Sequence, residues 1–189
     1  MKKLIAAMVI IVIAIVGFAA FKGNSPKQNT TKINIVASTD FYAELAQTVV
    51  GTHGTATAII KDPNVSPEDY EPTTEVAKKV SSADIALANG LEYDAWLNKL
   101  ARASKHTQLI RIGENVLKEK SGVNPHLWNS PETMTKTAQY LADKLSKQDS
   151  SHKKEYQANA KKYITSLKPV TELVGQLKKH TNNQSVAQT

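Results

Sequence analysis

Residues 32–60, "KINIVASTDFYAELAQTVVGTHGTATAII", contain the pattern that decides the fold class. The β-branched run at 32–38 predicts a strand. The next segment begins with helix-capping residues and ends at Gly51, which predicts a helix, and 55–60 predicts a second strand. A strand, a helix and a strand at this spacing are typical of a βαβ unit, in which the two strands run parallel.

The same alternation continues along the chain. The stretch "TTEVAKKVSSA" predicts a helix with Thr73 as its N-cap and Glu75 in its first turn, where a carboxylate suits the helix dipole. Two more strands are predicted at 84–89 and 107–112, with a helix at 93–104 between them. We therefore predict an α/β lobe over residues 33–148, built on a parallel sheet with flanking helices.

Two long loops, 62–72 and 113–129, each follow a predicted strand. In an open α/β sheet the loops that leave the carboxyl ends of the strands line the ligand crevice. We therefore expect these two loops to meet at one edge of the sheet. The second loop ends at "SPE" (130–132), a capping residue, a proline and an acid, which marks the start of a helix that runs to about Lys147.

Residues 149–180 are predicted to form one long helix that leads away from this lobe. Apolar residues recur every three or four positions along it: Tyr156, Ala160, Tyr163, Leu167, Val170, Val174 and Leu177. Such a stripe indicates a buried helix face, and Pro169 should kink the helix. A coiled-coil dimer is the alternative. Tyr and Ala at seam positions and the internal proline favour packing against the chain's own lobe, and hence a monomer.

Composition excludes several classes of function. The 189 residues include no cysteine, which rules out disulfides, thiolate metal sites, a cysteine nucleophile and acylation of a cysteine. The net charge of +7 comes from lysines in the first 22 residues and from seven lysines between 150 and 180. The rest of the chain is close to neutral, so we expect no nucleic-acid partner.

The N-terminal segment indicates export. Lys2 and Lys3 precede 18 residues without a charge, 4–21, which is the length of a long signal-peptide core or a short spanning helix. We predict that residues 1–22 are a signal peptide or membrane anchor and that 23–32 are a polar tether. The body would then be secreted or held at the outer face of the cytoplasmic membrane.

Two loop residues are candidates for metal binding. The loop "SPEDYEPT" (66–73) carries Glu68 among three acids, and His126 follows a proline in the other loop, next to Trp128. A solvated acidic turn and a structural histidine are the plainer interpretations. No hydrolase, P-loop or metalloprotease motif is present, so we expect no enzyme. The other histidines lie at unremarkable surface positions: His53, His106, His152 and His180.

Four stretches together resemble the substrate-binding proteins of bacterial zinc and manganese ABC importers. They are "INIVASTDFYAELAQTVVG", "SPEDYEPT", "ADIALANGLEYDAWLNKL" and "NPHLWNSPETM", in the family's order and at its spacing. The resemblance covers 33–189 and is strongest to the zinc-type branch. It implies two α/β lobes joined by a rigid helix, with one ion in the cleft between them and a membrane permease as the partner.

The resemblance also implies which residues bind the ion. The first lobe of the family supplies one histidine from a P-H-x-Y-E-P-T loop and another from an N/D-P-H-x-W loop. His126 matches the second, and Glu68 stands where the first is expected. We therefore expect Glu68 and His126 to bind Zn²⁺, with Mn²⁺ as the alternative, since carboxylate suits harder ions and imidazole suits zinc.

Two departures from the family leave alternatives open. Gram-positive members are usually anchored through a lipidated cysteine, which this sequence lacks, so a lipoprotein is not expected. Residues 181–189 are interpreted as the start of a truncated second lobe, with the remaining ligands absent. A membrane-tethered adhesion or interaction module, or a remnant without transport activity, is the alternative function.

Overall fold

The computed structural model of the chain describes residues 32–180. The predicted signal or anchor at 1–22, most of the tether, and the predicted start of a second lobe at 181–189 lie outside the described residues. Between residues 32 and 180, no helix combines the length and the apolar character needed to cross a membrane.

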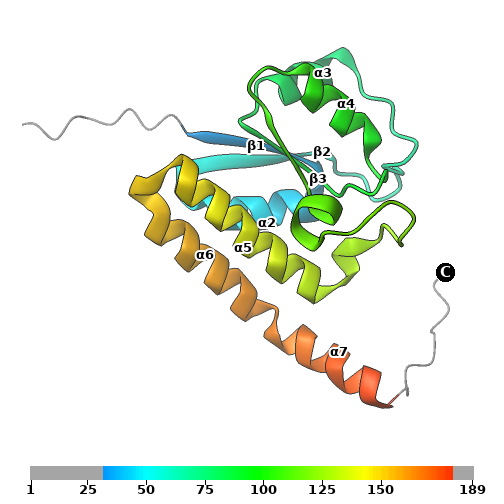
Figure 1. Cartoon of the computed structure of the whole chain (residues 1–189), viewed down its shortest axis with the longest axis vertical. Coiled ribbons are helices and arrows are strands. Elements are labelled where there is room, and N and C mark those ends of the chain that lie inside the picture. The colour runs from blue at the N-terminus through cyan, green and yellow to red at the C-terminus, as the bar shows by residue number, and fades with distance from the viewer. Residues whose placement is uncertain (1–31, 181–189) are drawn as a thin grey trace, which may run out of the picture. The chain divides into compact units, whose positions relative to one another are not determined.

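The centre of the lobe is a four-stranded, fully parallel sheet (Figure 1). In chain order the strands are β1 (Ile33–Thr39), β2 (Gly54–Ile60), β3 (Ile85–Ala88) and β4 (Gln108–Arg111). Their spatial order is β2-β1-β3-β4, so the chain steps outward from β1 first to one side and then to the other. The predicted α/β class with a parallel sheet is therefore confirmed, and the described residues contain a single such lobe.

Helices cover both faces of the sheet, as Figure 1 shows. One face is covered by α2 (Asp40–Val50), α5 (Pro131–Gln148) and α6 (Lys153–Ser166), and the other by α3 (Thr74–Ser81) and α4 (Ala95–Ala103). In β1, Ile35 and Ala37 belong to the first of these cores, and Val36 belongs to the second. Burial on both faces explains why the inner strand β3, with the sequence IALA, is apolar and buried at every position.

Two of the predicted helix caps are present, whereas Thr39 at the start of α2 makes no side-chain cap. The Thr73 hydroxyl accepts a hydrogen bond from the Val76 N–H at 3.3 Å and so caps α3. The Ser130 hydroxyl accepts one from the Thr133 N–H at 3.4 Å, with Pro131 in the first turn of α5. Each cap satisfies a backbone donor that has no partner inside its helix. The two helices begin where the sequence predicts.

The segment predicted as a plain loop at 113–129 is partly helical. Residues Ile112–Leu117 form a π-helical turn (η2) and Leu127–Asn129 a 3-10 turn (η3). The Arg111 N–H donates to the Asn115 side-chain oxygen at 2.8 Å, and the Arg111 guanidinium pairs with Glu114 at 3.0 Å. These two local contacts fold the chain back directly after β4, which hydrophobic periodicity does not reveal.

The predicted long helix is divided into two. After a short 3-10 turn, η4 (Ser150–His152), α6 ends at Ser166, and α7 (Lys168–His180) begins after an interruption at Leu167. Pro169 explains the break, because it has no N–H and its ring clashes with the carbonyl of the residue four positions earlier. In Figure 1, α7 extends beyond α6 and away from the sheet.

The apolar stripe is buried along only part of this region. Tyr156 and Ala160 of α6 are fully buried in the core formed with α2 and α5. In α7 the side chains of Val170, Leu173 and Leu177 are 51 to 55% exposed. Packing against the chain's own lobe, expected for the whole stripe, is therefore found for α6, whereas α7 is mostly exposed and contacts the lobe through α5.

Candidate functional site

The loop that carries Glu68 is fixed to the lobe by α4. The indole N–H of Trp96 donates to the carbonyl oxygen of Pro67 at 3.0 Å, and the Tyr70 ring lies 4.8 Å from the Trp96 ring. Trp96 and Pro67 are buried, whereas Glu68 and Asp69 are exposed. Contacts with Trp96 therefore hold the loop at Pro67 and at Tyr70, and the acidic residues between them face the solvent.

A buried hydrogen-bond chain holds the loop that carries His126. The Tyr42 hydroxyl of α2 donates to the Asn89 side-chain oxygen at 2.6 Å. The Asn89 amide group in turn donates to the carbonyl oxygen of Pro125 at 3.0 Å. Since Asn89 follows β3 directly, this chain ties the residue before His126 to the carboxyl edge of the sheet.

Asp94 braces the turn that carries Asn89. Its carboxylate accepts hydrogen bonds from the N–H groups of Asn89 and Gly90, at 2.6 and 3.0 Å. Burial raises the pKa of Asp94, while the hydrogen bonds from the N–H groups of Asn89 and Gly90 act in the opposite direction. Leu91 has a left-handed backbone with a φ of 53°, so the turn is strained and needs this support.

His126 is exposed and oriented by its neighbour. Its Nδ1 lies 2.8 Å from the side-chain oxygen of Asn124, which also accepts the His126 backbone N–H at 2.9 Å. An Nδ1–H that donates to this oxygen leaves Nε2 as a free lone pair, the arrangement that metal-binding histidines use.

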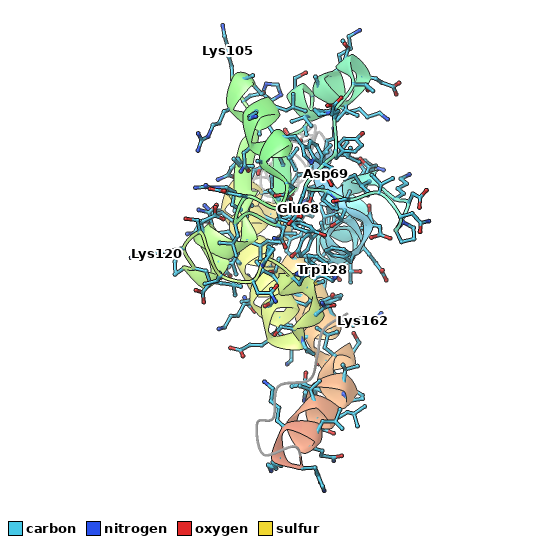
Figure 2. All side chains as sticks on the ribbon, turned by 90° about the vertical axis from the view of Figure 1, so that its right-hand side faces the viewer. Glu68, Asp69, Lys105, Lys120, Trp128 and Lys162 are labelled. Atoms are coloured by element: carbon cyan, nitrogen blue, oxygen red, sulfur yellow. The ribbon has the colours of Figure 1, made fainter. Side chains whose placement is uncertain are left out.

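Tyr93 connects the two predicted ligands. Its ring lies 5.9 Å from the His126 ring and 5.0 Å from that of Trp128. Burial and the nearby charge of Glu68 raise the pKa of the Tyr93 hydroxyl. Glu68 and Trp128 lie on the same face of the lobe, the one turned to the viewer in Figure 2. Glu68 and His126, on the loops that follow β2 and β4, therefore both lie near one tyrosine.

A hollow of about 300 Å³ lies at this edge of the sheet. The ends of β1 and β2 and the side chains of Pro67, Tyr93 and Trp128 form its walls. Trp128 also stacks on Phe41, with 4.9 Å between the ring centroids. Neither Glu68 nor His126 lines the hollow, although Pro67 and Tyr93 do. Its position is that of the crevice expected at the carboxyl ends of parallel strands.

Neither predicted ligand belongs to a group of three histidine or acidic side chains that could share an ion, within residues 32–180. The one such group in this part of the chain is His53, His152 and Glu155. From the sequence, both of these histidines were expected to be unremarkable. The one local signal was the spacing of three residues between His152 and Glu155, which places two side chains on one side of a helical turn.

Comparison with known proteins identifies the family. The profile described as "ZnuA: Zinc-uptake complex component A periplasmic" matches residues 35–189. The chain belongs to the ZnuA family. The predicted resemblance to metal substrate-binding proteins of ABC importers is thus confirmed.

Curated relatives of this ZnuA-family chain are named as manganese-binding or iron-binding proteins. It is 29% identical over 88% of its length to the manganese ABC transporter substrate-binding lipoprotein PsaA of Streptococcus pneumoniae, covering 58% of that protein. It is 25% identical over 92% of its length to the manganese-binding lipoprotein MntA of Halalkalibacterium halodurans, covering 59%. It is 27% identical over 82% of its length to the iron-binding protein YfeA of Yersinia pestis, covering 52%.

Solved structures share the fold. The Zn(II)-bound ZnuA-like domain of AdcA from Streptococcus pneumoniae matches with a TM-score of 0.66 and 24% identity, over 75% of this chain and 54% of that one. A Mn-bound periplasmic metal-binding protein from Candidatus Liberibacter asiaticus matches with a TM-score of 0.68 and 24% identity, over 78% and 58%. The chain spans a little more than half the length of the relatives it matches.

Proposed function

We propose that this chain captures a divalent metal ion outside the cytoplasmic membrane, for delivery to the permease of an ABC importer. Family membership supports this class of function and supports export of the body. It also argues against an enzyme, because the family consists of solute-binding proteins. The chain would act as a monomer, at the outer face of the membrane or secreted, and without nucleic acid.

The observation that carries the proposal is the arrangement around Tyr93. Glu68 and His126 lie near this ring on two loops that are each anchored by a hydrogen bond from a buried side chain, Trp96 or Asn89. One imidazole nitrogen and one carboxylate are donors that suit Zn²⁺ and Mn²⁺. We propose these two side chains as the metal ligands that this lobe supplies.

The donor set does not select one metal. Relatives are named for manganese and iron, and solved neighbours hold zinc or manganese. We propose Zn²⁺ as the ion carried, with Mn²⁺ as the alternative. Two protein ligands are fewer than the three or four of ordinary zinc sites. The affinity of the described lobe for either ion should therefore be weak.

Titration calorimetry of the full chain with Zn²⁺ and with Mn²⁺ tests this proposal. His126→Ala should weaken binding at the site beside Tyr93 about 10-fold or more, because it removes the only nitrogen ligand proposed for that site. His106→Ala, at an exposed histidine that precedes β4, is the matched control and should leave the affinity unchanged. An affinity of this site that is the same in the wild type and in His126→Ala would contradict the assignment. A chain that binds neither ion would favour an interaction module instead.

A further inference from the structure

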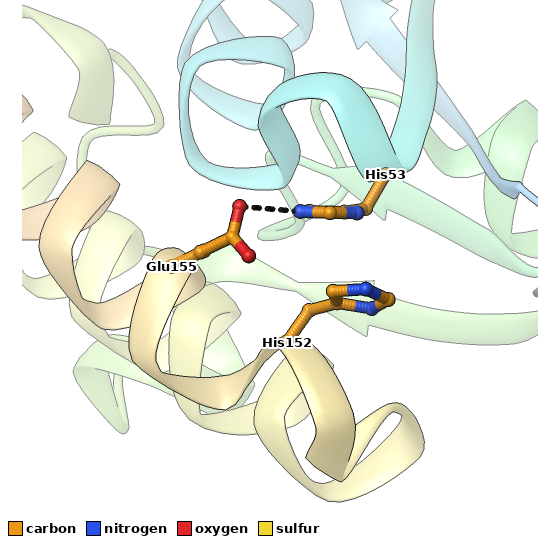
Figure 3. Close-up of side chains that lie close together, drawn as sticks. All are labelled: His53, His152 and Glu155. Atoms are coloured by element: carbon orange, nitrogen blue, oxygen red, sulfur yellow. Dashed lines mark hydrogen bonds and ion pairs between the residues drawn. The ribbon is translucent and has the colours of Figure 1, made fainter. Parts of the chain in front are cut away.

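Three side chains from two distant parts of the sequence meet in one cluster (Figure 3). His53 belongs to the short turn η1 (Gly51–His53) directly before β2, His152 to η4, and Glu155 to the first turn of α6. One ligand atom from each lies within 4.8 Å of the others. Because His53 precedes a strand whereas Glu68 follows one, the two sites lie at opposite ends of β2.

The existing contacts within this cluster show how closely it is packed. His53 Nε2 and Glu155 Oε2 are 2.7 Å apart, and the rings of His53 and His152 stack with 3.7 Å between centroids. The side chains of the two histidines are 19 and 22% exposed, and that of Glu155 is 60% exposed. The cluster therefore has a sheltered imidazole pair and one side open to water and ions.

A second carboxylate supports His152 from behind. His152 Nδ1 lies 2.6 Å from Asp149 Oδ2, and the same oxygen accepts a hydrogen bond from the Tyr156 hydroxyl at 2.8 Å. Metal-binding histidines commonly donate their other N–H to a carboxylate in this way, which fixes the ring and leaves one nitrogen for the ion. Asp149 thus leaves His152 Nε2 available.

The backbone on both sides of the cluster is held independently of any ion. Asn159 of α6 donates to the carbonyl oxygen of Val49 at 3.3 Å. The amide group of Asn159 also lies close to Gly51: a Cβ added at Gly51 would be only 2.7 Å from the Asn159 amide nitrogen. The middle of α6 is therefore in contact with the end of α2, and His53 does not need a metal to reach its two partners.

We propose that His53, His152 and Glu155 form a second metal site, specific for zinc or a similar first-row ion, with water as the remaining ligand. Two imidazoles and one carboxylate form a donor set that zinc uses in open sites. The ion would replace the hydrogen bond between His53 and Glu155, with both becoming ligands. Since lone pairs lie in the ring planes, one of the stacked rings must tilt to share the ion.

Such a site would clip α6 to the turn before β2, and this goes beyond the proposed capture of a transported ion. The transported ion has to enter and leave at the carboxyl edge. An ion at this second site would instead join two elements whose sequence positions differ by about one hundred residues. We therefore expect bound zinc to stabilise the fold, since a ligand that binds only the folded state raises the unfolding temperature.

The experiment compares metal-free full chain with three sets of variants, using Zn²⁺ for calorimetry and thermal melts and Co²⁺ as the spectroscopic probe. The first set removes ligands of the second site, by Glu155→Gln alone and by His53→Gln with His152→Gln. Glu155→Gln can still accept a hydrogen bond from His53, so it should fold. The second is His126→Ala, and the third is the matched control His106→Gln.

The wild type should show a Zn²⁺-dependent rise in melting temperature and the intense visible absorption of low-coordinate Co²⁺. Both signals should persist in His126→Ala and His106→Gln. The ligand variants should lose both signals. The zinc affinity of this site should fall by at least about 10- to 100-fold, which is the usual loss when a residue that hydrogen-bonds to a metal ligand is removed. Histidine side-chain NMR signals of His53 and His152 should shift on zinc addition.

Two results would overturn the proposal. One is zinc affinity and melting behaviour that are the same in the wild type and in Glu155→Gln. The other is zinc addition that shifts His126 but leaves the signals of His53 and His152 in place, which would show that the cluster is only a hydrogen-bond network. The two proposals can fail independently. The effect of His126→Ala tests only the site of the transported ion, and the effect of Glu155→Gln tests only the cluster of His53, His152 and Glu155.

Discussion

At the scale of single residues, Glu68 is the most informative position. It stands where the resemblance implies a histidine, in a loop held by the hydrogen bond between Trp96 and Pro67. Glu68→His should raise the affinity for Zn²⁺ about 10-fold and shift the preference from Mn²⁺ towards Zn²⁺, since imidazole is the better zinc ligand. Competition calorimetry with the two ions measures both effects.

The control for that change lies in the same loop. Glu71→His makes the same chemical substitution at another exposed carboxylate and should leave both affinities unchanged. If Glu68→His also changes neither affinity, the loop does not reach the ion and Glu68 is not a ligand.

Tyr42 should act on the site through Asn89. Tyr42→Phe removes the hydroxyl that donates to the side-chain oxygen of Asn89, a fully buried residue, and this oxygen loses that hydrogen bond. We expect a loss of about 1–3 kcal/mol in the free energy of unfolding, measured by urea titration, together with weaker metal binding because Asn89 also holds Pro125. Tyr140→Phe, at a half-buried tyrosine of α5, is the control. An unchanged free energy of unfolding in Tyr42→Phe would contradict the role proposed for the hydrogen bonds that join Tyr42, Asn89 and Pro125.

At the scale of elements, Pro169 is expected to decide where the helical region breaks. Pro169→Ala restores a backbone N–H that can bond to the carbonyl of Thr165 and removes the ring that clashes with it. The helix should then continue through Leu167. Carbon chemical shifts of residues 166–168 measure this local helicity. Lys168→Ala, next to the proline, is the control and should keep the break, and a break that persists in Pro169→Ala would show another cause.

The elements that the sequence predicts correctly are those with a strong local signal. β1 and β3 are short apolar runs buried on both faces, and α3 and α5 begin at Thr73 and Ser130, whose side chains form the caps. The turn η2 was missed because it depends on where the side chains of Asn115 and Glu114 bond. Local propensity carries no information about such contacts.

The same distinction applies to the sites. His126 could be singled out because it follows a proline in a loop after a strand, and the family motif marks it. His53 and Glu155 are 102 positions apart, and they meet only because α6 packs back along α2. No periodicity or spacing in one segment predicts that contact. The cluster exists only in the folded lobe.

At the scale of the whole molecule, the described residues form one lobe with a helical extension. Its core is shared between two layers of helices around the sheet, while α7 exposes Val170, Leu173 and Leu177. The hollow beside Tyr93 and the cluster around His53 lie at opposite edges of the same sheet. The two proposed metal sites are therefore separate, and the proposed transported ion and the proposed stabilising ion would not compete for the same ligands.

The main proposal is that a divalent ion binds at the carboxyl edge between Glu68 and His126. Crystallography of the full chain soaked with Zn²⁺ or Mn²⁺, with anomalous diffraction to locate the ion, tests it without an intermediate assumption. We predict an anomalous peak about 2.0–2.1 Å from His126 Nε2 for zinc, with a carboxylate oxygen of Glu68 at a similar distance. A fully occupied ion elsewhere, with no peak beside His126, would contradict the proposal.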